Sequence, residues 1–346
     1  MARVSIHIVA WNSMRYLPDA LRSIFEQTYR DFSVIVVDNG SSDGVEEWVR
    51  NHFPEVIILR NTKNLGFARA HNQAIALARS IWEKSPPGGE PLVLVTNPDI
   101  VLTPTFLETM VRAADSHPET GSLGGKLRKI FSPSSETGQP LYSNIIDTTG
   151  LRLYRSRRFV ERGAGEEDRG QFDQAGPVFG VSGALAFYRL SALEAARYDN
   201  EYFDDDFFAY KEDVDLAWRL QLLGFDARYE SNALAYHWRG AYGSEKRGVG
   251  KAIRERKIKS PVVNFLSTRN QCLLLIKNDE RVNLFRHLLW ILPAELGRFL
   301  WVLLREPATL SAYLDCLRLR PKMKTKRAAV FAKRQRSAAD IRKWFV

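Results

Sequence analysis

The feature that most constrains this chain is the alternation of short β-branched runs with helical patterns through its first hundred residues. The runs VSIHIVA, FSVIVVD, VIILR and PLVLVTN have the length and composition of buried strands. Strands that alternate with helices at this spacing form a parallel sheet with helical crossovers. The sequence therefore predicts an α/β fold, with helices near residues 18–27, 45–51 and 67–84.

Polar residues follow each of these strands, at the point where the strand ends. In open α/β sheets, ligands bind beyond the carboxyl ends of the strands. We therefore expect one binding site at this edge, built from Trp11 and Asn12, Asp38 and Asn39, residues 61–66, and residues 97–99.

The middle of the chain has a weaker pattern. Residues 132–176 are short polar segments, which predict a hairpin and mobile loops over the site. The later segments predict a strand turning into a helix over 178–189, a helix over 207–225 with an acidic first turn, and a strand over 226–238 that ends in His237.

The last part of the chain, residues 261–346, is predominantly helical and carries the basic charge. Residues 251–346 contain 22 Lys and Arg against 7 Asp and Glu, which leaves 28 against 33 in residues 1–250. Nucleic-acid binding is disfavoured, because the basic run at 318–327 lacks aromatic residues on which bases could stack.

Residues 288–304 form the most apolar stretch, but Pro293, Glu295 and Arg298 interrupt it. A spanning helix needs about 20 mostly apolar residues, so an amphipathic helix lying among lipid headgroups fits better. Its interfacial aromatic residues would be Trp290, Phe299 and Trp301. The basic run would add roughly 1 kcal/mol of attraction per basic residue near an anionic surface. The alternative is an ordinary helical appendage packed on the core.

Cysteine usage and the N-terminus both favour a cytoplasmic location. Cys272 and Cys316 are far apart in the sequence, so a disulfide framework is not expected. The N-terminal segment reads as a strand and shows no secretion signal.

The turn VVDNGSSDG, residues 36–44, places two carboxylates directly after a strand. Asp38 could bond a pyrimidine base or a ribose hydroxyl, and small residues from Ser41 to Gly44 would let the backbone approach the ligand. The alternative is that Asp38 and Asp43 cap the next helix.

The segment NTKNLGFARAHNQAI, residues 61–75, opens a helix after another strand end. Helix N-terminal amides and the Arg69 guanidinium could meet a diphosphate. A solvated helix start is the alternative.

Asp99 and His237 are candidate ligands of a divalent cation. Asp99 follows a buried strand, where a hard cation could bridge protein and phosphates, and His237 could supply a second ligand. One carboxylate is a weak metal signal, and a lone histidine is more often structural.

The segment KEDVDL, residues 211–216, puts Glu212, Asp213 and Asp215 in the first turn of a helix. The helix dipole stabilises negative charge there, but a carboxylate at the mouth of a site can also accept a proton from an attacking hydroxyl. Glu212 and Asp215 share a face while Asp213 points elsewhere, so we expect two different roles.

Together these segments, over about residues 4–240, resemble the family 2 inverting glycosyltransferases of the GT-A fold, particularly bacterial rhamnosyltransferase-like members. The resemblance implies a mixed, mostly parallel sheet flanked by helices. It implies a transferase domain over 1–260, with a nucleotide-sugar half (1–125) and an acceptor half (126–260), followed by the helical region 261–346.

The resemblance also assigns roles to residues. It implies a nucleotide-sugar donor site, a divalent cation (Mg²⁺ or Mn²⁺), and Asp213 as general base beside Glu212. The donor residues are Ala10, Asn12, Asp38, Asp43, Asn64, Gly66, Arg69 and Asn97; the metal ligands are Asp99 and His237; the acceptor residues are Ser182, Gly183, Ala184 and Trp238. The family's DXD motif appears here in the looser form Asn97–Pro98–Asp99.

The function that the resemblance implies is transfer of L-rhamnose from dTDP-rhamnose to a polyprenyl-linked saccharide or oligosaccharide, on the inner face of the plasma membrane. UDP-galactofuranose, UDP-N-acetylhexosamine and GDP-mannose are alternative donors. Competing classes are a sugar-nucleotide hydrolase, a non-catalytic membrane scaffold and a nucleotidyltransferase. The last is disfavoured because AWNSMRYL stands where a Gly-rich phosphate loop would be needed.

Overall fold

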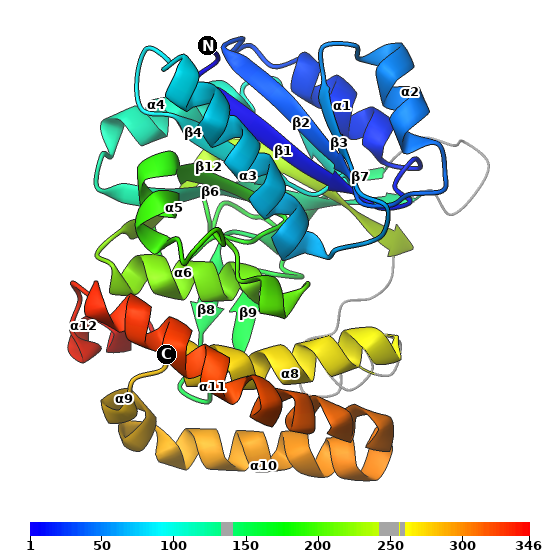
Figure 1. Ribbon diagram of the computed structural model, residues 1–346. Helices are drawn as coiled ribbons and strands as arrows, with labels where there is room; N and C mark the ends of the chain where they lie inside the picture. Colours follow the sequence, from blue (N-terminus) through cyan, green and yellow to red (C-terminus); the bar gives the residue numbers. More distant parts are fainter. Residues whose placement is uncertain (133–140, 242–255, 257–259) are drawn as a thin grey trace.

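The computed structural model describes residues 1–132, 141–241, 256 and 260–346. A large sheet with helices on both faces forms the upper part of the molecule in Figure 1, and the C-terminal helices form a layer below it. The predicted mixed α/β fold with a helical C-terminal region is therefore confirmed.

The N-terminal half of the sheet is parallel, as its alternating pattern predicts. Its strands lie in the order β4–β1–β2–β3. Their carboxyl ends are aligned, because Ala10 pairs with Asp38 and Asp38 pairs with Arg60. The bounds are β1 Val4–Ala10, β2 Phe32–Asp38, β3 Ile57–Arg60 and β4 Leu92–Thr96.

Helices cover both faces of this sheet and bury two hydrophobic clusters. One face carries α1 (Leu17–Phe25), α2 (Val45–His52) and α4 (Phe106–Ser116). The other face carries α3 (Phe67–Lys84), α5 (Leu190–Ala196) and α6 (Glu212–Leu222). Burial on both faces explains why these strands are continuous apolar runs instead of alternating ones.

The second half of the sheet is mixed and brings distant segments together. Strand β11 (Leu185–Arg189) lies antiparallel between β4 and β6 (Thr120–Ser132), and β12 (Asp226–Ala241) runs parallel to β6. The short strand β5 (Ile100–Leu102) pairs with β12 so that Ile100 lies opposite His237. The remaining strands of this sheet are β7 (Leu141–Thr148) and β10 (Gly176–Val178).

Three predicted boundaries were wrong. The helix expected from residue 207 begins at Glu212, because Phe208, Tyr210 and Lys211 have positive φ angles that an α-helix excludes. A short 3₁₀ helix, Asp205–Phe207, stands there instead. The last strand continues past His237 to Ala241, and the segment 178–189 is two strands joined by a loop.

A two-stranded hairpin leaves the main sheet and points toward the C-terminal helices (Figure 1). It consists of β8 (Leu151–Leu153) and β9 (Phe159–Glu161), paired so that Leu151 lies opposite Glu161. This fits the hairpin predicted within 132–176, of which residues 133–140 lie outside the described part of the chain.

The C-terminal helices pack against the α/β part of the molecule instead of standing apart from it. Helices α8 and α11 share a buried cluster with α6 and the hairpin, and the final residue donates its N–H to the carbonyl of Leu153. The bounds are α8 Pro261–Asn278, α9 Arg281–Arg286, α10 Leu288–Arg305, α11 Ser311–Ala332 and α12 Ala338–Arg342. Within the described residues, no helix is both long and apolar enough to cross a bilayer.

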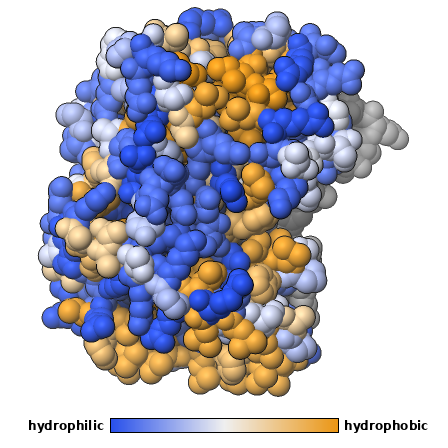
Figure 2. Space-filling model, in the orientation of Figure 1, coloured by the Kyte–Doolittle hydropathy of each residue, from blue (hydrophilic) through white to orange (hydrophobic). Residues whose placement is uncertain are grey.

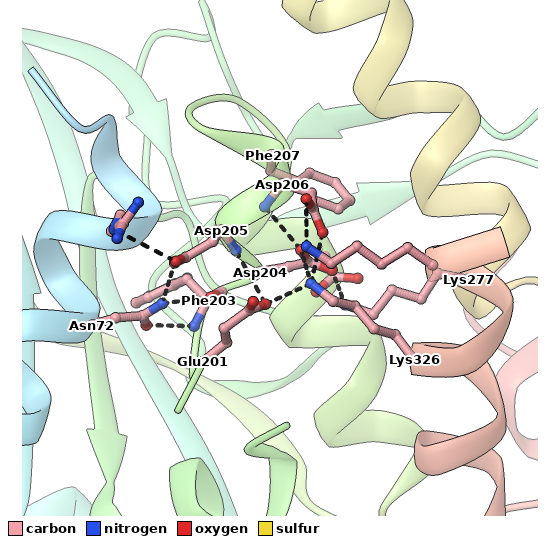
Figure 3. A network of polar contacts seen from close by, with 12 residues as sticks. Asn72, Glu201, Phe203, Asp204, Asp205, Asp206, Phe207, Lys277 and Lys326 are labelled. Atoms are coloured by element: carbon pink, nitrogen blue, oxygen red, sulfur yellow. Dashed lines mark hydrogen bonds and ion pairs between the residues drawn. The ribbon is translucent and has the colours of Figure 1, made fainter. Parts of the chain in front are cut away.

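A buried group of carboxylates and lysines, which we call the lysine clamp, joins the two parts (Figure 3). Asp204, in the loop before α6, lies 2.6 Å from Lys277 Nζ and 2.6 Å from Lys326 Nζ. The clamp also contains Glu201, Asp206 and Asp215, which bond the same two lysines. Lysines of α8 and α11 therefore neutralise an acidic loop of the α/β part of the molecule.

Two cations of the basic run face into the protein. Lys326 is only 1% exposed and bonds the clamp carboxylates, and Arg327 donates to the carbonyls that end α8. Arg318, Arg320, Lys322 and Lys324 are exposed, so attraction of this run to an anionic surface stays a prediction. Cys316, on the same helix, is hydrogen-bonded to Cys272 as a free thiol, although the two are far apart in the sequence.

Candidate active site

The ends of β1 and β2 form two interlocked loops, as the strand pattern predicts. Asn12 accepts the N–H of Ser42 at 2.9 Å, and the N–H of Asn12 donates to Ser41 Oγ at 3.1 Å. Asp38 is buried and accepts the N–H of Ser41, while Asn39 donates its N–H to the carbonyl of Ala10. The predicted nucleoside residues are thus brought together at one sheet edge.

The capping alternative for these aspartates is wrong. Helix α2 begins after Gly44 and receives no side-chain cap. Asp43 instead accepts the N–H of Met14 at 2.9 Å, so this carboxylate ties the second loop to the first. The order in the loops comes from these cross-links between them.

The segment before α3 is held by amides. Asn64 accepts the Asn39 side chain at 2.9 Å and the N–H of Gly66 at 2.8 Å. Gly66 has φ +83°, and a Cβ there would lie 2.5 Å from the carbonyl oxygen of Phe208. Arg69 lies mostly exposed, with Nε 3.9 Å from an Asp205 oxygen.

Asp99 and His237 lie together, as the metal hypothesis requires. His237 Nε2 is 3.2 Å from Asp99 Oδ1, and His237 Nδ1 is 2.7 Å from Asp147 Oδ2. A proton on Nδ1, shared with the Asp147 carboxylate, leaves the lone pair on the nitrogen that faces Asp99. A carboxylate behind a histidine is the usual support of a metal-binding imidazole.

These residues fit a divalent cation in part. Among the described residues, the buried Asp99 Oδ1 accepts no hydrogen bond, so an oxygen with ligand capacity remains beside an imidazole nitrogen. No group of three or more metal-binding side chains occurs in the described residues. Two protein ligands would leave most of an octahedral shell to phosphate oxygens and water.

A cavity of about 880 Å³ opens beside this edge and contains the predicted base. Asp213 Oδ2 accepts the N–H of Gly183 at 2.9 Å, and Oδ1 accepts the N–H of Val214. Burial raises the pKa of the Asp213 carboxyl, although these two hydrogen bonds oppose the rise. A Cβ at residue 183 would lie 3.0 Å from the Cβ of Asp213, so a glycine permits this close approach.

The acidic first turn of α6 divides into two roles, but not in the predicted grouping. Asp215 is buried in the lysine clamp, whereas Asp213 lines the cavity. Glu212, which was predicted to share a face with Asp215, lines the cavity with Asp213. Burial first, and the Asp213 charge second, raise the pKa of Glu212 well above its ordinary value. Its Oε2 has no hydrogen-bond partner in the described part of the chain.

Sequence reasoning missed several cavity residues. Glu161, on β9, accepts a hydrogen bond from the Ser182 hydroxyl at 2.9 Å. Burial is the main cause, and the Asp213 charge the second, that raises the pKa of Glu161 to about 7. Sequence reasoning also missed Arg152, Arg158 and Lys211 in the cavity and Asp147 behind His237. Periodicity could not have found them, because the hairpin and the positive-φ turn carry no motif of their own.

The structure places the predicted residues in two groups. Asn97, Gly183, Ala184, Glu212 and Asp213 line the cavity, and Ser182 lies behind its wall on Glu161. Trp238 packs on Tyr16, away from the residues that line the cavity. The strand-end edge outside the cavity carries Ala10, Asn12, Asp38, Asp43, Asn64, Gly66, Arg69, Asp99 and His237.

Curated proteins of related sequence are glycosyltransferases by name. The chain is 28% identical over 237 residues to an N-acetylglucosaminyl-diphospho-decaprenol L-rhamnosyltransferase of Mycobacterium tuberculosis, covering 66% of this chain and 74% of that protein. It is 25% identical over 237 residues to a poly-beta-1,6-N-acetyl-D-glucosamine synthase of Staphylococcus epidermidis, covering 67% of this chain and 49% of that one.

Solved structures share the fold. TarS of S. aureus matches with a TM-score of 0.55 at 16% identity, over 99% of this chain and 55% of that chain. GalNAc-T7, solved with UDP, GalNAc and Mn²⁺, matches with a TM-score of 0.53 at 12% identity, over 80% of this chain and 48% of that chain. The model of glycosyl transferase family 2 matches residues 5–196. This family match covers more than half of the chain and agrees with the arrangement of the strand-end edge and the cavity. The chain therefore belongs to glycosyl transferase family 2 and is a glycosyltransferase.

Proposed function

We propose that the protein transfers a sugar from a nucleoside diphosphate to an acceptor hydroxyl with inversion at the anomeric carbon, and that Asp213 is the general base. The observation that carries this proposal is the Asp213 carboxylate in the cavity wall, held by two backbone N–H groups. Its two hydrogen bonds fix its orientation, and no cationic side chain pairs with it in the described part of the chain. The charge of Lys211 lowers its pKa, but burial raises that pKa by more.

In this mechanism Asp213 accepts the proton of the acceptor hydroxyl while the hydroxyl oxygen attacks the anomeric carbon. The bond from that carbon to the diphosphate breaks in the same displacement, and the nucleoside diphosphate leaves. The interlocked loops around Asp38 and Asn12 would bind the nucleoside, with Asn64, Gly66 and Asn97 between them and the cavity. Arg69 would have to turn from Asp205 to reach a phosphate.

Asp99 and His237 would hold Mg²⁺ or Mn²⁺, and Asp147 would orient the imidazole. When bound, such a cation supplies positive charge to the departing diphosphate. GalNAc-T7, which shares the fold, was solved with Mn²⁺.

The first donor to test is dTDP-rhamnose, because a relative is named as an L-rhamnosyltransferase. A second relative is named for N-acetyl-D-glucosamine polymerisation, so UDP-N-acetylglucosamine is the next donor. UDP-galactofuranose and GDP-mannose complete the set. The acceptor proposed is a saccharide on a polyprenyl diphosphate, as in the rhamnosyltransferase name, for cell-wall polysaccharide synthesis.

We also propose that α9 and α10 bind the inner face of the plasma membrane. Their outward side is covered with exposed apolar side chains, visible along the lower edge of Figure 2. Trp290 and Phe299 lie on this side, whereas Trp301 is half-buried and donates to Glu306. The exposed residues are Val282, Phe285, Leu289, Trp290, Leu292, Leu296, Phe299, Leu300, Leu303 and Leu304.

The test of catalysis has two steps. Thermal unfolding is first measured with dTDP, UDP, GDP or CDP, with and without Mn²⁺, because a ligand that binds only the folded protein raises its melting temperature. The matching sugar nucleotide is then incubated with a prenyl-diphosphate saccharide, and the product linkage is read by NMR. Transfer with inversion supports the proposal; release of free sugar alone, with every acceptor tried, would establish the hydrolase alternative.

The membrane proposal is tested by co-sedimentation with lipid vesicles. Leu296→Asp should reduce binding strongly, because it places a charge at the centre of the apolar face. The control Leu141→Asp changes an exposed apolar residue far from α10. Equal binding by both variants would contradict the assignment of this face.

A further inference from the structure

The cavity extends beyond the catalytic carboxylates along the β8–β9 hairpin. Glu161, at one end of β9, lines the same cavity as Asp213, whose charge raises the pKa of Glu161. The turn of the hairpin lies at the other end, where the Arg155 guanidinium sits 5.3 Å from the Trp290 ring of α10. The hairpin therefore connects the predicted base with the proposed membrane face.

Four cationic side chains line the cavity. Arg162 donates to the carbonyl of Thr149 and lies over the Tyr229 ring, and the other three lie along the hairpin and beside it. They are Arg152 on β8, Arg158 just before β9, and Lys211 before α6. Tyr154, Phe159 and Ser267 line the same stretch. The carboxyl groups of the cavity come from other positions, namely Glu161, Glu166, Glu212 and Asp213.

These three cations have no carboxylate partner among the described residues, and Arg152 and Arg158 are exposed to the cavity opening. Within the described residues, neither Arg152 nor Arg158 forms an ion pair, and Lys211 bonds only the neutral amide of Gln271. Arg157, in the same turn, is by contrast fully buried and bonds both carboxylate oxygens of Asp279. The fold therefore pairs the arginine that holds the hairpin in place and leaves the cavity-lining arginines unpaired.

Lys211 gives independent support for an anion-binding site in the cavity. Burial is the main cause, and the charge of Arg298 the second, that lowers the pKa of its ammonium group to about 7. Removing a cation from water without a partner is unfavourable, and a bound anion would remove this penalty. A site of two guanidinium groups and one ammonium group suits phosphate oxygens, because guanidinium forks bond them in pairs.

We propose that Arg152, Arg158 and Lys211 bind the diphosphate of the lipid-linked acceptor. This inference rests on the proposed function, since it takes the reacting hydroxyl to lie at Asp213. Arg158 is three residues from Glu161 along an extended strand, or about 10 Å. That length accommodates a sugar whose hydroxyl is at Asp213 and whose anomeric phosphate is at Arg158. The prenyl chain would then leave past the hairpin turn toward α10.

The test measures direct binding, so that it does not depend on turnover. The probes are N-acetylglucosamine linked through a diphosphate to a farnesyl chain and the farnesyl glycoside of the same sugar without phosphates. Calorimetry in detergent micelles compares the wild-type protein with the double variant R152Q/R158Q. The matched control is R155Q, which removes an exposed arginine of the same turn.

We expect the wild-type protein to bind the diphosphate probe at least 10-fold more tightly than the neutral one. The double variant should lose about 10- to 100-fold of affinity for the diphosphate probe alone, since hydrogen bonds to charged groups are among the strongest in proteins. R155Q should bind both probes as the wild type does. Unchanged melting temperatures would show that the variants remain folded.

Three results would overturn the inference. The wild type could bind both probes equally, or the double variant could lose affinity for both. The double variant could instead lose affinity for the nucleoside diphosphate, which would place the donor's phosphates on these arginines. Absence of sugar transfer by the wild type, with diphosphate binding retained, would contradict the proposed function and leave the anion site standing.

Discussion

Two groups of buried carboxylates meet at the start of α6, one in the cavity and one in the lysine clamp, and they have different partners. In the cavity, Asp213 accepts two backbone N–H groups, and Glu212 Oε2 has no partner among the described residues. Burial raises the pKa of both carboxyl groups. In the lysine clamp, burial by itself raises the pKa of Asp204, but Lys277 and Lys326 together hold that pKa below its ordinary value. Similar burial thus has opposite consequences.

The difference follows from which charges surround each group. A carboxylate beside a cation is stabilised in its charged form and is a poor proton acceptor at neutral pH. Asp213 keeps a raised pKa because burial outweighs its N–H hydrogen bonds and the charge of Lys211, and a raised pKa suits the proposed general base. The clamp therefore stabilises the junction of the two parts, and the cavity carboxyl groups stay more basic than that of Asp204.

The largest effect expected is on catalysis. Asp213→Asn keeps the size of the side chain but removes its basicity, so turnover should fall by about 10²–10⁴-fold. Nucleotide binding, measured by calorimetry, should stay close to the wild-type value. Turnover retained in this variant would show that another group is the base.

The clamp should respond in stability instead. Lys277→Met removes the cation between Asp204 and Asp215, and breaking a buried pair in this way lowers the free energy of unfolding by about 3–5 kcal/mol. The control is Lys322→Met, whose side chain is 51% exposed and whose pair with Asp206 should contribute only about 0–1 kcal/mol. Urea unfolding compares the two variants, and equal losses would contradict the role of burial.

Asp147 belongs to neither group, because its partner is a histidine. Asp147→Asn should weaken Mn²⁺ binding by about 10- to 100-fold, as expected when the support of a metal-binding imidazole is removed. Calorimetry with nucleoside diphosphate present measures this affinity. Asp173→Asn, which alters an exposed carboxylate on Lys126, serves as the control. Unchanged Mn²⁺ affinity in the Asp147 variant would remove the metal assignment.

The smallest effect expected is the pH dependence of stability at Glu161. Its pKa is about 7 in the folded protein against an ordinary 4.5, because of burial and the nearby Asp213 and Asp147. The folded state binds this proton more tightly, so the stabilisation is full below pH 4.5 and is lost as pH rises through 7. Glu161→Gln should therefore gain melting temperature relative to the wild type between pH 5 and pH 8.

Thermal unfolding at the two pH values gives this comparison. Ser182 and Thr148 donate to different oxygens of Glu161. In the glutamine, one hydroxyl can donate to the amide oxygen and the other can accept from the amide NH2, because a hydroxyl does both. A constant difference between variant and wild type across this range would show that Glu161 is ionised throughout.

Much of the strand-end edge could be predicted because its signals are local. A strand end, a turn and a helix start lie within a few residues of one another around Asp38 and Asn64, and parallel pairing aligns them. The acidic turn of α6 was readable for the same reason. Its start was not, since positive φ angles at Tyr210 and Lys211 come from contacts made by the folded loop.

The sequence by itself determined the alternating α/β architecture and the residues at each strand end, because both depend on periodicity along the chain. Only the tertiary structure decided that Lys326 is buried in the clamp, that Glu161 faces Asp213, and that Arg157 is paired while Arg158 is not. These outcomes depend on which segments meet across long sequence separations. Burial and partner charge, which set the chemistry of each group, exist only after that meeting.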